Sequence, residues 1–198
     1  MVKKKAYQLV FDGLADWETP LTLCAIRESA RFDVVSMGFS TTPVTTMGGL
    51  KLTPDISVEK VNPADAGIVI LPGGDRWEHQ TDPDLEALLR RLNAADVPLA
   101  AICGATLGIA RAGLTRNRRH TSNGKRYIKT MIPDYSDEAF YVDSLAVTDR
   151  NVITASGLGA VEFGREVITL LNLFDAAETQ EWFDMYKRGV VPARYQMM

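Results

Sequence analysis

The hydrophobic residues along the chain form two patterns that alternate from the N-terminus onward. Residues 67–71 and 97–103 are continuous apolar runs, which are typical of strands buried on both faces. Pro83–Ala94 places its leucines three or four positions apart, which is typical of a helix with one buried face. Alternation of such segments is typical of an α/β fold with a largely parallel sheet.

The same two patterns predict the remaining elements. The further predicted strands cover residues 6–11, 33–39, 44–46, 50–53, 145–148 and 152–155, and the last four of these form two hairpins. The further predicted helices cover residues 17–31, 104–112, 159–172 and 176–188. No repeat, low-complexity tract or linker interrupts the pattern, so we expect one domain over residues 1–198.

The composition is that of a folded globular protein, with 46% hydrophobic and 24% charged residues. The formal charge of −3 provides no electrostatic reason to bind nucleic acid or an anionic membrane. The apolar run at residues 6–11 is too short for a signal peptide or a membrane span, so we expect a cytoplasmic protein. The two cysteines and two histidines match no disulfide framework and no zinc spacing, and we expect neither a metal nor a cofactor.

The most informative position is Cys103, which lies where a predicted buried strand runs directly into a predicted helix. Such a sharp turn needs small neighbours because the strand and helix backbones nearly touch, and Ala101, Gly104 and Ala105 supply them. This pattern is typical of a nucleophile elbow with cysteine in the place of serine. The elbow would expose the sulfur at the carboxyl ends of the strands, and the helix N-terminus would favour the thiolate. A buried structural cysteine is the alternative interpretation.

Two further predictions follow from the local pattern. The Gly104 amide and the Gly74 amide, in the loop that follows the strand at residues 67–71, are candidate donors for a developing oxyanion. An ordinary turn is the alternative interpretation of that loop. Cys24 lies on the apolar face of the helix predicted at residues 17–31, so we expect it to be part of the core.

Four segments carry a resemblance to a known family: residues 68–74, 100–104, 121–122 and 153–157. Together they resemble the ThiJ/PfpI superfamily, which is related to the class I glutamine amidotransferases. Residues 73–77 are similar to a YdeA-like bacterial branch of it. The resemblance implies a flavodoxin-like three-layer sandwich with a mostly parallel central sheet, a homodimer, and a reactive cysteine at the elbow.

The resemblance also implies that Glu18 lies beside the sulfur of Cys103. A carboxyl buried next to an anion has a raised pKa, and in its protonated form it can donate a hydrogen bond to the thiolate. Without the resemblance, Glu18 would be interpreted as a carboxylate at the start of a helix.

The sequence departs from the superfamily pattern at the histidines. Proteolytic relatives have a histidine directly after the cysteine, and this chain has Gly104 there. Amidotransferases need a histidine late in the chain as general base, and no histidine follows His120 in this sequence. Protease and amidotransferase activity are therefore disfavoured. Asn123 aligns with the histidine that approaches the cysteine in other relatives, and His120, three residues earlier, is an alternative. Further candidates for the pocket are Trp17, Asp75 and Ser156.

The predicted function is that of a cysteine-dependent enzyme acting on a small molecule, with hydrolase, hydratase or glyoxalase/deglycase-like chemistry at Cys103 and Glu18. The alternative is a redox-sensing or stress-protective protein in which Cys103 is oxidised without turnover. A scaffold with no reactive thiol is a third hypothesis. The basic residues between positions 116 and 129 are either a solvated loop or an entrance that attracts an anionic substrate.

Overall fold

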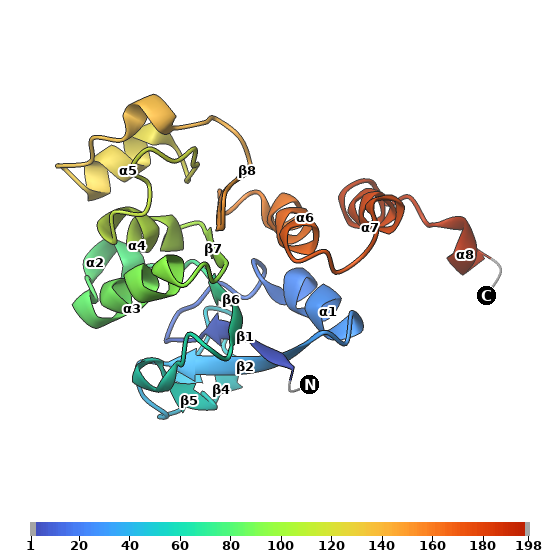
Figure 1. Ribbon diagram of the computed structural model, residues 1–198, viewed down its shortest axis with the longest axis horizontal. Coiled ribbons are helices and arrows are strands. Elements are labelled where there is room, and N and C mark those ends of the chain that lie inside the picture. The colour runs from blue at the N-terminus through green and yellow to red at the C-terminus, as the bar shows by residue number, and fades with distance from the viewer. Residues whose placement is uncertain (1–2, 197–198) are drawn as a thin grey trace.

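The computed structural model describes residues 3–196, and its centre is a seven-stranded sheet (Figure 1). The strand order is β5-β2-β1-β6-β7-β9-β8, and every pair is parallel except β8–β9. The strands are β1 (Lys4–Leu9), β2 (Phe32–Gly38), β5 (Ile56–Ser57), β6 (Ala66–Leu71), β7 (Leu99–Ile102), β8 (Ala146–Asp149) and β9 (Val152–Ala155). A separate hairpin pairs β3 (Val44–Thr45) with β4 (Lys51–Leu52).

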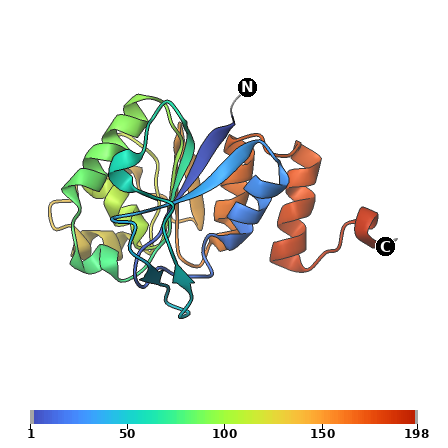
Figure 2. The same ribbon diagram turned by 90° about the horizontal axis from the view of Figure 1, so that it is seen from below.

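Helices cover both faces of the sheet, as Figure 2 shows most clearly. One face packs against α1 (Pro20–Glu28) and α6 (Ala160–Leu170), and α7 (Ala176–Arg188) packs on the outside of α6 (Figure 2). The other face packs against α3 (Pro83–Ala94) and α4 (Ala105–Arg111). The shorter helices are α2 (Arg76–His79), α5 (Lys125–Met131), α8 (Ala193–Gln196) and two 3-10 turns, η1 (Val58–Lys60) and η2 (Glu138–Phe140). The three layers confirm the predicted flavodoxin-like sandwich.

The central strands divide their side chains between the two helical layers. In β6, Ile68 and Ile70 belong to the cluster that packs against α1 and α6, whereas Val69 and Leu71 belong to the cluster that packs against α3 and α4. All four are fully buried. Burying each such side chain stabilises the fold by roughly 1.5–3 kcal/mol, which is why β6 is apolar at every position.

The first helix differs from its prediction in two ways. It begins at Pro20 rather than at residue 17, so Glu18 lies in the preceding turn and not on the helix. The expectation that Cys24 is part of the core is wrong, because Cys24 is exposed. The buried stripe of α1 consists of Thr22, Ala25 and Ile26, and position 24 lies on the opposite side of a helix with 3.6 residues per turn.

The segment between α4 and β8 contained no predicted element, yet it includes α5 and η2. Ile128 is the only buried residue of α5, so the hydrophobic spacing that reveals longer helices is absent there. In Figure 1 this segment, called the cap segment below, lies beside α4.

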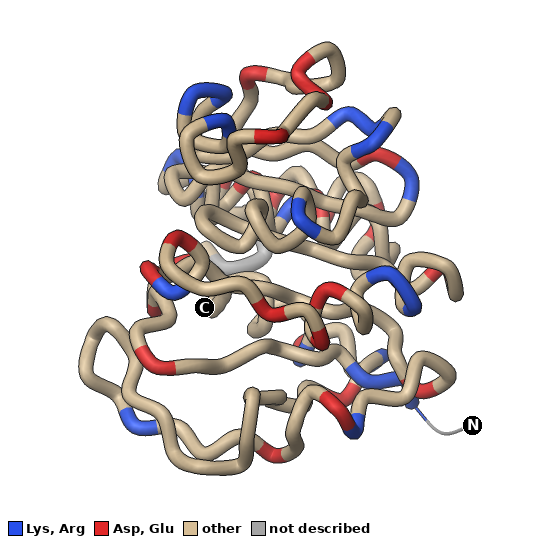
Figure 3. Tube along the Cα trace, turned by 90° about the vertical axis from the view of Figure 1, so that its left-hand side faces the viewer, with Lys and Arg blue, Asp and Glu red and all other residues tan. Residues whose placement is uncertain are grey.

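Within residues 3–196, no helix has the length and apolar character needed to cross a bilayer. Figure 3 shows lysines and arginines interspersed with acidic residues along the chain.

Candidate active site

Cys103 lies at the sharp turn predicted from the small residues around it. β7 ends at Ile102 and α4 begins at Ala105, and Cys103 between them has a φ of 60°. For a residue other than glycine this left-handed conformation costs about 1–2 kcal/mol. Three hydrogen bonds hold it: the Cys103 N–H donates to Ala155 O (2.8 Å), and Thr106 donates to Cys103 O from its N–H (3.1 Å) and its hydroxyl (2.6 Å).

Glu18 is fully buried against the cysteine turn. Its Oε2 accepts a hydrogen bond of 2.5 Å from the Gly73 N–H. A Cβ atom on Gly73 would lie 2.6 Å from Cys103 Cβ and 2.8 Å from each carboxyl oxygen, so only glycine fits between the two residues. Burial raises the pKa of Glu18 to about 7, although the Gly73 bond and the contact with Cys103 oppose the shift.

Gly157 shows that the sulfur and the free carboxyl oxygen share one small space. A Cβ atom on Gly157 would lie 2.9 Å from Cys103 Sγ and 3.4 Å from Glu18 Oε1. Among the described residues, no hydrogen bond of good geometry satisfies Oε1. The carboxyl oxygen therefore faces the thiol, in a position to exchange a proton with it.

The thiol is less acidic than the elbow pattern predicts. Burial and the negative charge of Glu18 raise the pKa of Cys103 to about 11. Hydrogen bonds from Asn123 and from the Gly104 N–H act in the opposite direction but do not compensate. The Gly104 N–H lowers the thiol pKa, the direction expected of a helix N-terminus, whereas burial and Glu18 raise it. Burial thus raises the pKa of both members of the pair.

Asn123 occupies the position next to the sulfur that the alignment assigned to it. Its Nδ2 donates to Cys103 Sγ at 3.2 Å, and its Oδ1 accepts from the Gly157 N–H at 2.9 Å. The second bond fixes which end of the amide faces the sulfur. Asn123 is exposed and Cys103 is partly exposed, so the cysteine lies near the surface of the protein.

His120 does not reach the site. It is fully buried, its Nδ1 is 2.7 Å from Arg118 O, and its Nε2 is 2.5 Å from the Tyr135 hydroxyl. Because a carbonyl can only accept, Nδ1 carries the proton and Nε2 accepts from Tyr135. Burial lowers the pKa of His120, which keeps the imidazole neutral. These two bonds join parts of the segment between α4 and β8 to each other.

The two glycines predicted as oxyanion donors lie on loops that touch each other. A Cβ atom on Gly104 would lie 3.1 Å from Gly74 O, and Gly74 has a φ of 148° that disfavours other residues.

The remaining pocket candidates, within the described part of the chain, are not hydrogen-bonded to the cysteine or the glutamate. Trp17 and Asp75 are exposed and Ser156 is partly exposed, and within the described residues no hydrogen bond or ion pair joins them to Cys103 or Glu18.

Sequence reasoning did not identify the contribution of Trp77. Its Nε1–H donates to Pro72 O at 2.8 Å, and its ring would lie 2.5 Å from a Cβ atom on Gly108. Trp77 thus stabilises the loop that contains Gly73 and Gly74, and its ring packs against α4. The available signal was the i, i+4 pair of glycines at 104 and 108, which is typical of a close approach by a large side chain.

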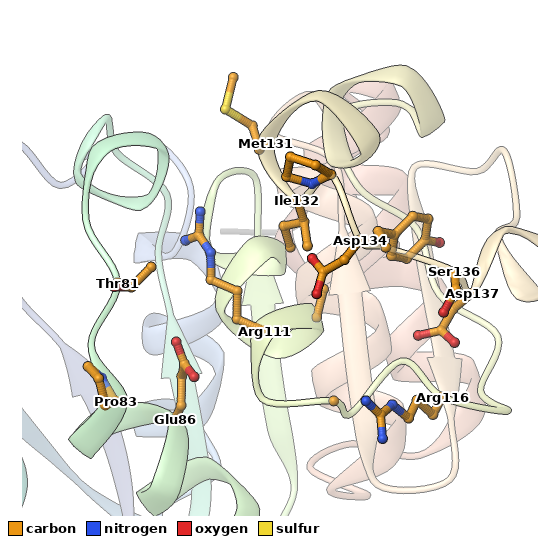
Figure 4. Close-up of a pocket in the computed structure, with 14 residues that line it drawn as sticks. Thr81, Pro83, Glu86, Arg111, Arg116, Met131, Ile132, Asp134, Ser136 and Asp137 are labelled. Atoms are coloured by element: carbon orange, nitrogen blue, oxygen red, sulfur yellow. The ribbon is translucent and has the colours of Figure 1, made fainter.

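The basic residues of the segment at residues 116–129 are mostly exposed to solvent, and Arg118 is the exception. Arg118 is buried and donates to Asp149 O (2.8 Å), and Lys129 pairs with Glu138. A cavity of about 480 Å³ does lie between α3, α4 and the loop that follows α5 (Figure 4). Its lining includes Arg111 and Asp134 but not Cys103.

Within residues 3–196, no cluster of three or more His, Cys, Asp and Glu side chains is arranged to hold a metal ion.

These features define an α/β protein with a cysteine at a strand-to-helix elbow and a buried glutamate beside it. The sequence model described as the DJ-1/PfpI family matches residues 4–170, and the chain belongs to that family. It is 34% identical over 197 residues to a Bacillus subtilis protein named "Uncharacterized protease YoaZ", covering 94% of this chain and 92% of that protein. It is 31% identical over 181 residues to the B. subtilis "Uncharacterized protease YdeA", covering 90% and 88%.

A solved structure of a thiJ/pfpI family protein from Bacillus anthracis matches with a TM-score of 0.90 and 32% identity, covering 100% of this chain and 95% of that one. More distant relatives have other names. A deglycase from Thermococcus kodakarensis is 25% identical, covering 85% of this chain and 99% of that protein. A glutathione-independent glyoxalase from Caenorhabditis elegans is 26% identical, covering 70% and 73%. These relatives are thus named for three activities: protease, deglycase and glyoxalase.

Proposed function

We propose that this protein is a cysteine-dependent enzyme that acts on a small carbonyl compound, with Cys103 as the nucleophile and Glu18 as the group that moves the proton. The observation that supports this most strongly is the placement of a fully buried carboxyl against the thiol, with a pKa that burial raises to about 7. An acid–base group is most effective when its pKa is close to the working pH. Proton exchange between Glu18 and Cys103 is therefore suited to neutral conditions.

The first step is addition of the sulfur to the carbonyl carbon. The thiol proton passes to Glu18, a carbon–sulfur bond forms, and the carbonyl π electrons move to oxygen. The Gly104 and Gly74 N–H groups are the proposed donors for that oxygen. The oxygen then takes the proton from Glu18, which gives a hemithioacetal and returns Glu18 to its carboxylate form.

With a ketoaldehyde, the reaction continues without an external oxidant or reductant. Glu18 removes the proton from the carbon bonded to sulfur and returns it to the neighbouring carbonyl carbon. The hydroxyl proton of the hemithioacetal moves to the oxygen of that neighbouring carbon, so the carbon bonded to sulfur becomes the thioester carbonyl. The resulting thioester is hydrolysed by water to a 2-hydroxy acid, which regenerates the thiol. The relatives named deglycase and glyoxalase support this choice of chemistry.

Proteolysis is less well supported, although the relatives YoaZ and YdeA are named proteases. Asn123 is the side chain that donates to Cys103 Sγ. A neutral amide can donate to the sulfur but cannot accept its proton and pass it to a leaving amine, as a histidine does in cysteine proteases.

We also propose that the protein is a homodimer, because it resembles the ThiJ/PfpI superfamily. Light scattering would test this oligomeric state.

The test is turnover of small aldehydes and ketoaldehydes by four proteins: wild type, Cys103→Ala, Glu18→Gln and Cys24→Ala. We expect Cys103→Ala to be inactive, Glu18→Gln to lose at least about a hundredfold in kcat/KM, and Cys24→Ala to match wild type. A Cys103→Ala protein as active as wild type on every substrate turned over would overturn the assignment.

The second candidate function is redox sensing through oxidation of Cys103. It is favoured by the partial exposure of the sulfur and by the Asn123 amide, which can donate to an oxygen added there. Intact mass and peptide mapping after graded peroxide would test it. We expect the first added oxygen on Cys103, whereas oxidation of the exposed Cys24 first would contradict this function.

A further inference from the structure

The asparagine that donates to the sulfur of Cys103 is followed in the chain by a glycine. Asn123–Gly124 is the only Asn-Gly pair in the sequence, and each of the other asparagines is followed by a residue with a side chain. An Asn-Gly pair is chemically labile, because the backbone nitrogen of the glycine can attack the asparagine side chain without obstruction by a Cβ atom. The sequence therefore places a labile amide beside the reactive cysteine.

The fold leaves this pair of residues open to the reaction. Asn123 is exposed and lies in an irregular bend just before α5 begins at Lys125. Gly124 has a φ of 142°, and a Cβ atom built on it would have no neighbour within 4 Å. Within residues 3–196, the Gly124 N–H donates to no hydrogen bond, so neither a helix nor a strand holds the attacking nitrogen in place.

The side-chain amide of Asn123 is already polarised in the direction that the reaction needs. Its Oδ1 accepts a hydrogen bond of 2.9 Å from the Gly157 N–H. Negative charge develops on this oxygen when a nitrogen adds to Cγ, and a fixed backbone donor stabilises that charge as an oxyanion hole does. The nitrogen that would depart, Nδ2, faces the partly exposed Cys103 through one bond of 3.2 Å. The surroundings of the amide thus favour attack at Cγ.

We propose that Asn123 is a site of spontaneous deamidation, and that this modification lowers the reactivity of Cys103 as the protein ages. The Gly124 nitrogen loses its proton to water and forms a bond to Asn123 Cγ. The bond between Cγ and Nδ2 then breaks, and Nδ2 takes up a proton from water and leaves as ammonia. Water opens the resulting cyclic imide to aspartate, or to isoaspartate, in which the main chain runs through Cγ. Water is the only co-reactant, and nothing is oxidised or reduced.

The product changes the surroundings of the sulfur in two ways. A carboxylate cannot donate, so Cys103 Sγ loses the hydrogen bond that Asn123 Nδ2 supplies. A negative charge at this position adds to that of Glu18, which already raises the pKa of the thiol. A carboxylate oxygen can still accept from the Gly157 N–H, so the new charge stays beside the sulfur. The inference goes beyond the proposed function, because it concerns the thiol whether or not the protein turns over a substrate.

The test follows the protein during long incubation at mildly alkaline pH under reducing conditions. A Cys24→Ser background removes the exposed second thiol. Peptide mapping by mass spectrometry measures the conversion of amide to carboxyl at each asparagine, and intact mass measures the rate at which iodoacetamide alkylates Cys103. We expect conversion at Asn123 well ahead of the other asparagines, with the alkylation rate falling in proportion. Gly124→Ala adds a Cβ atom to the attacking residue and should slow both changes together.

Asn123→Asp reproduces one product of the reaction without any incubation. It should be alkylated about three- to tenfold more slowly than Asn123→Ala, because alanine only removes the donor whereas aspartate also adds a partly screened charge. Asn172→Asp is the matched control and introduces the same charge at an exposed position. Asn172 follows the C-terminal end of α6, whereas the N-terminal end of that helix begins three residues after Gly157, so the alkylation rate should not change.

Either of two results would overturn the inference. The first is an Asn123 amide that stays intact in the folded protein while the same amide is converted in a synthetic peptide of residues 119–127, which would mean that the fold protects it. The second is an Asn123→Asp protein that is alkylated as fast as the protein with Asn123, which would mean that the modification leaves the thiol unaffected. Alkylation does not depend on turnover, so neither result bears on the proposed enzyme activity.

Discussion

Replacing Glu18 with glutamine should stabilise the protein at neutral and alkaline pH. The substitution keeps the shape of the side chain and an oxygen acceptor for the Gly73 N–H, but removes a carboxyl that burial disfavours in its charged form. Below the unfolded-state pKa of 4.5, Glu18 is protonated in both states and costs nothing through ionisation. As the pH rises towards about 7, the unfolded state ionises first and the native state loses stability relative to it.

The size of the effect follows from the two pKa values. A difference between 4.5 and about 7, at about 1.4 kcal/mol for each pKa unit, corresponds to about 3 kcal/mol. For a chain of this size that is a difference of roughly 6–12 °C in Tm. Above the native pKa, the wild-type protein has lost all of this free energy of unfolding. Glu18→Gln should therefore show its full gain in stability over wild type by about pH 8.

The assay is urea unfolding of wild type and Glu18→Gln at several pH values from about 4.5 to 8. The difference between the two free energies of unfolding should grow steadily with pH across this range. His120, whose pKa is lowered by burial, titrates in both proteins and cancels in the difference. Glu28→Gln, at an exposed position, is the matched control and should show no such trend. A pH-independent difference for Glu18→Gln would refute the assignment of a raised native pKa to Glu18.

Three further substitutions test the contacts around the sulfur. Asn123→Ala removes the donor to Cys103 Sγ, so the thiol pKa should rise and alkylation near neutral pH should slow about tenfold; an unchanged rate would contradict the contact. Gly157→Ala places a Cβ atom 2.9 Å from the sulfur, so iodoacetamide labelling should fall at least about tenfold while circular dichroism stays unchanged. Trp77→Phe removes the Nε1–H bond to Pro72 O and should lower the free energy of unfolding in urea by about 1–3 kcal/mol. Trp17→Phe, at an exposed position, should lower it by less than about 0.5 kcal/mol.

The elements that the sequence predicts best are those with an uninterrupted hydrophobic pattern and clear ends. α3 and α7 have the predicted bounds, and α7 also has a capping box between Asp175 and Glu178 and a left-handed Gly189 at its end. The cap segment that contains α5 was missed for the opposite reason. It is held by contacts such as the His120–Tyr135 bond, which joins residues 15 positions apart and leaves no periodic hydrophobic pattern.

The site was predictable where its chemistry depends on neighbours in the sequence. Small residues around Cys103 revealed the elbow, and its φ of 60° agrees with that interpretation. The direction of the shift in the thiol pKa was not predictable in this way. It depends on burial by distant segments and on the charge of Glu18, and these outweigh the local effect of the helix N-terminus. Gly157, 34 residues from Asn123, is likewise brought to the sulfur only by the folded sheet.

We propose that Cys103 and Glu18 act as one proton-exchanging pair. The most direct measurement is the pH dependence of Cys103 alkylation by iodoacetamide in a Cys24→Ser background, with Glu18 intact and with Glu18→Gln. Because the charge of Glu18 raises the pKa of the thiol, the account predicts that Glu18→Gln moves the alkylation curve to lower pH by at least about one unit. Superimposable curves for the two proteins would contradict it.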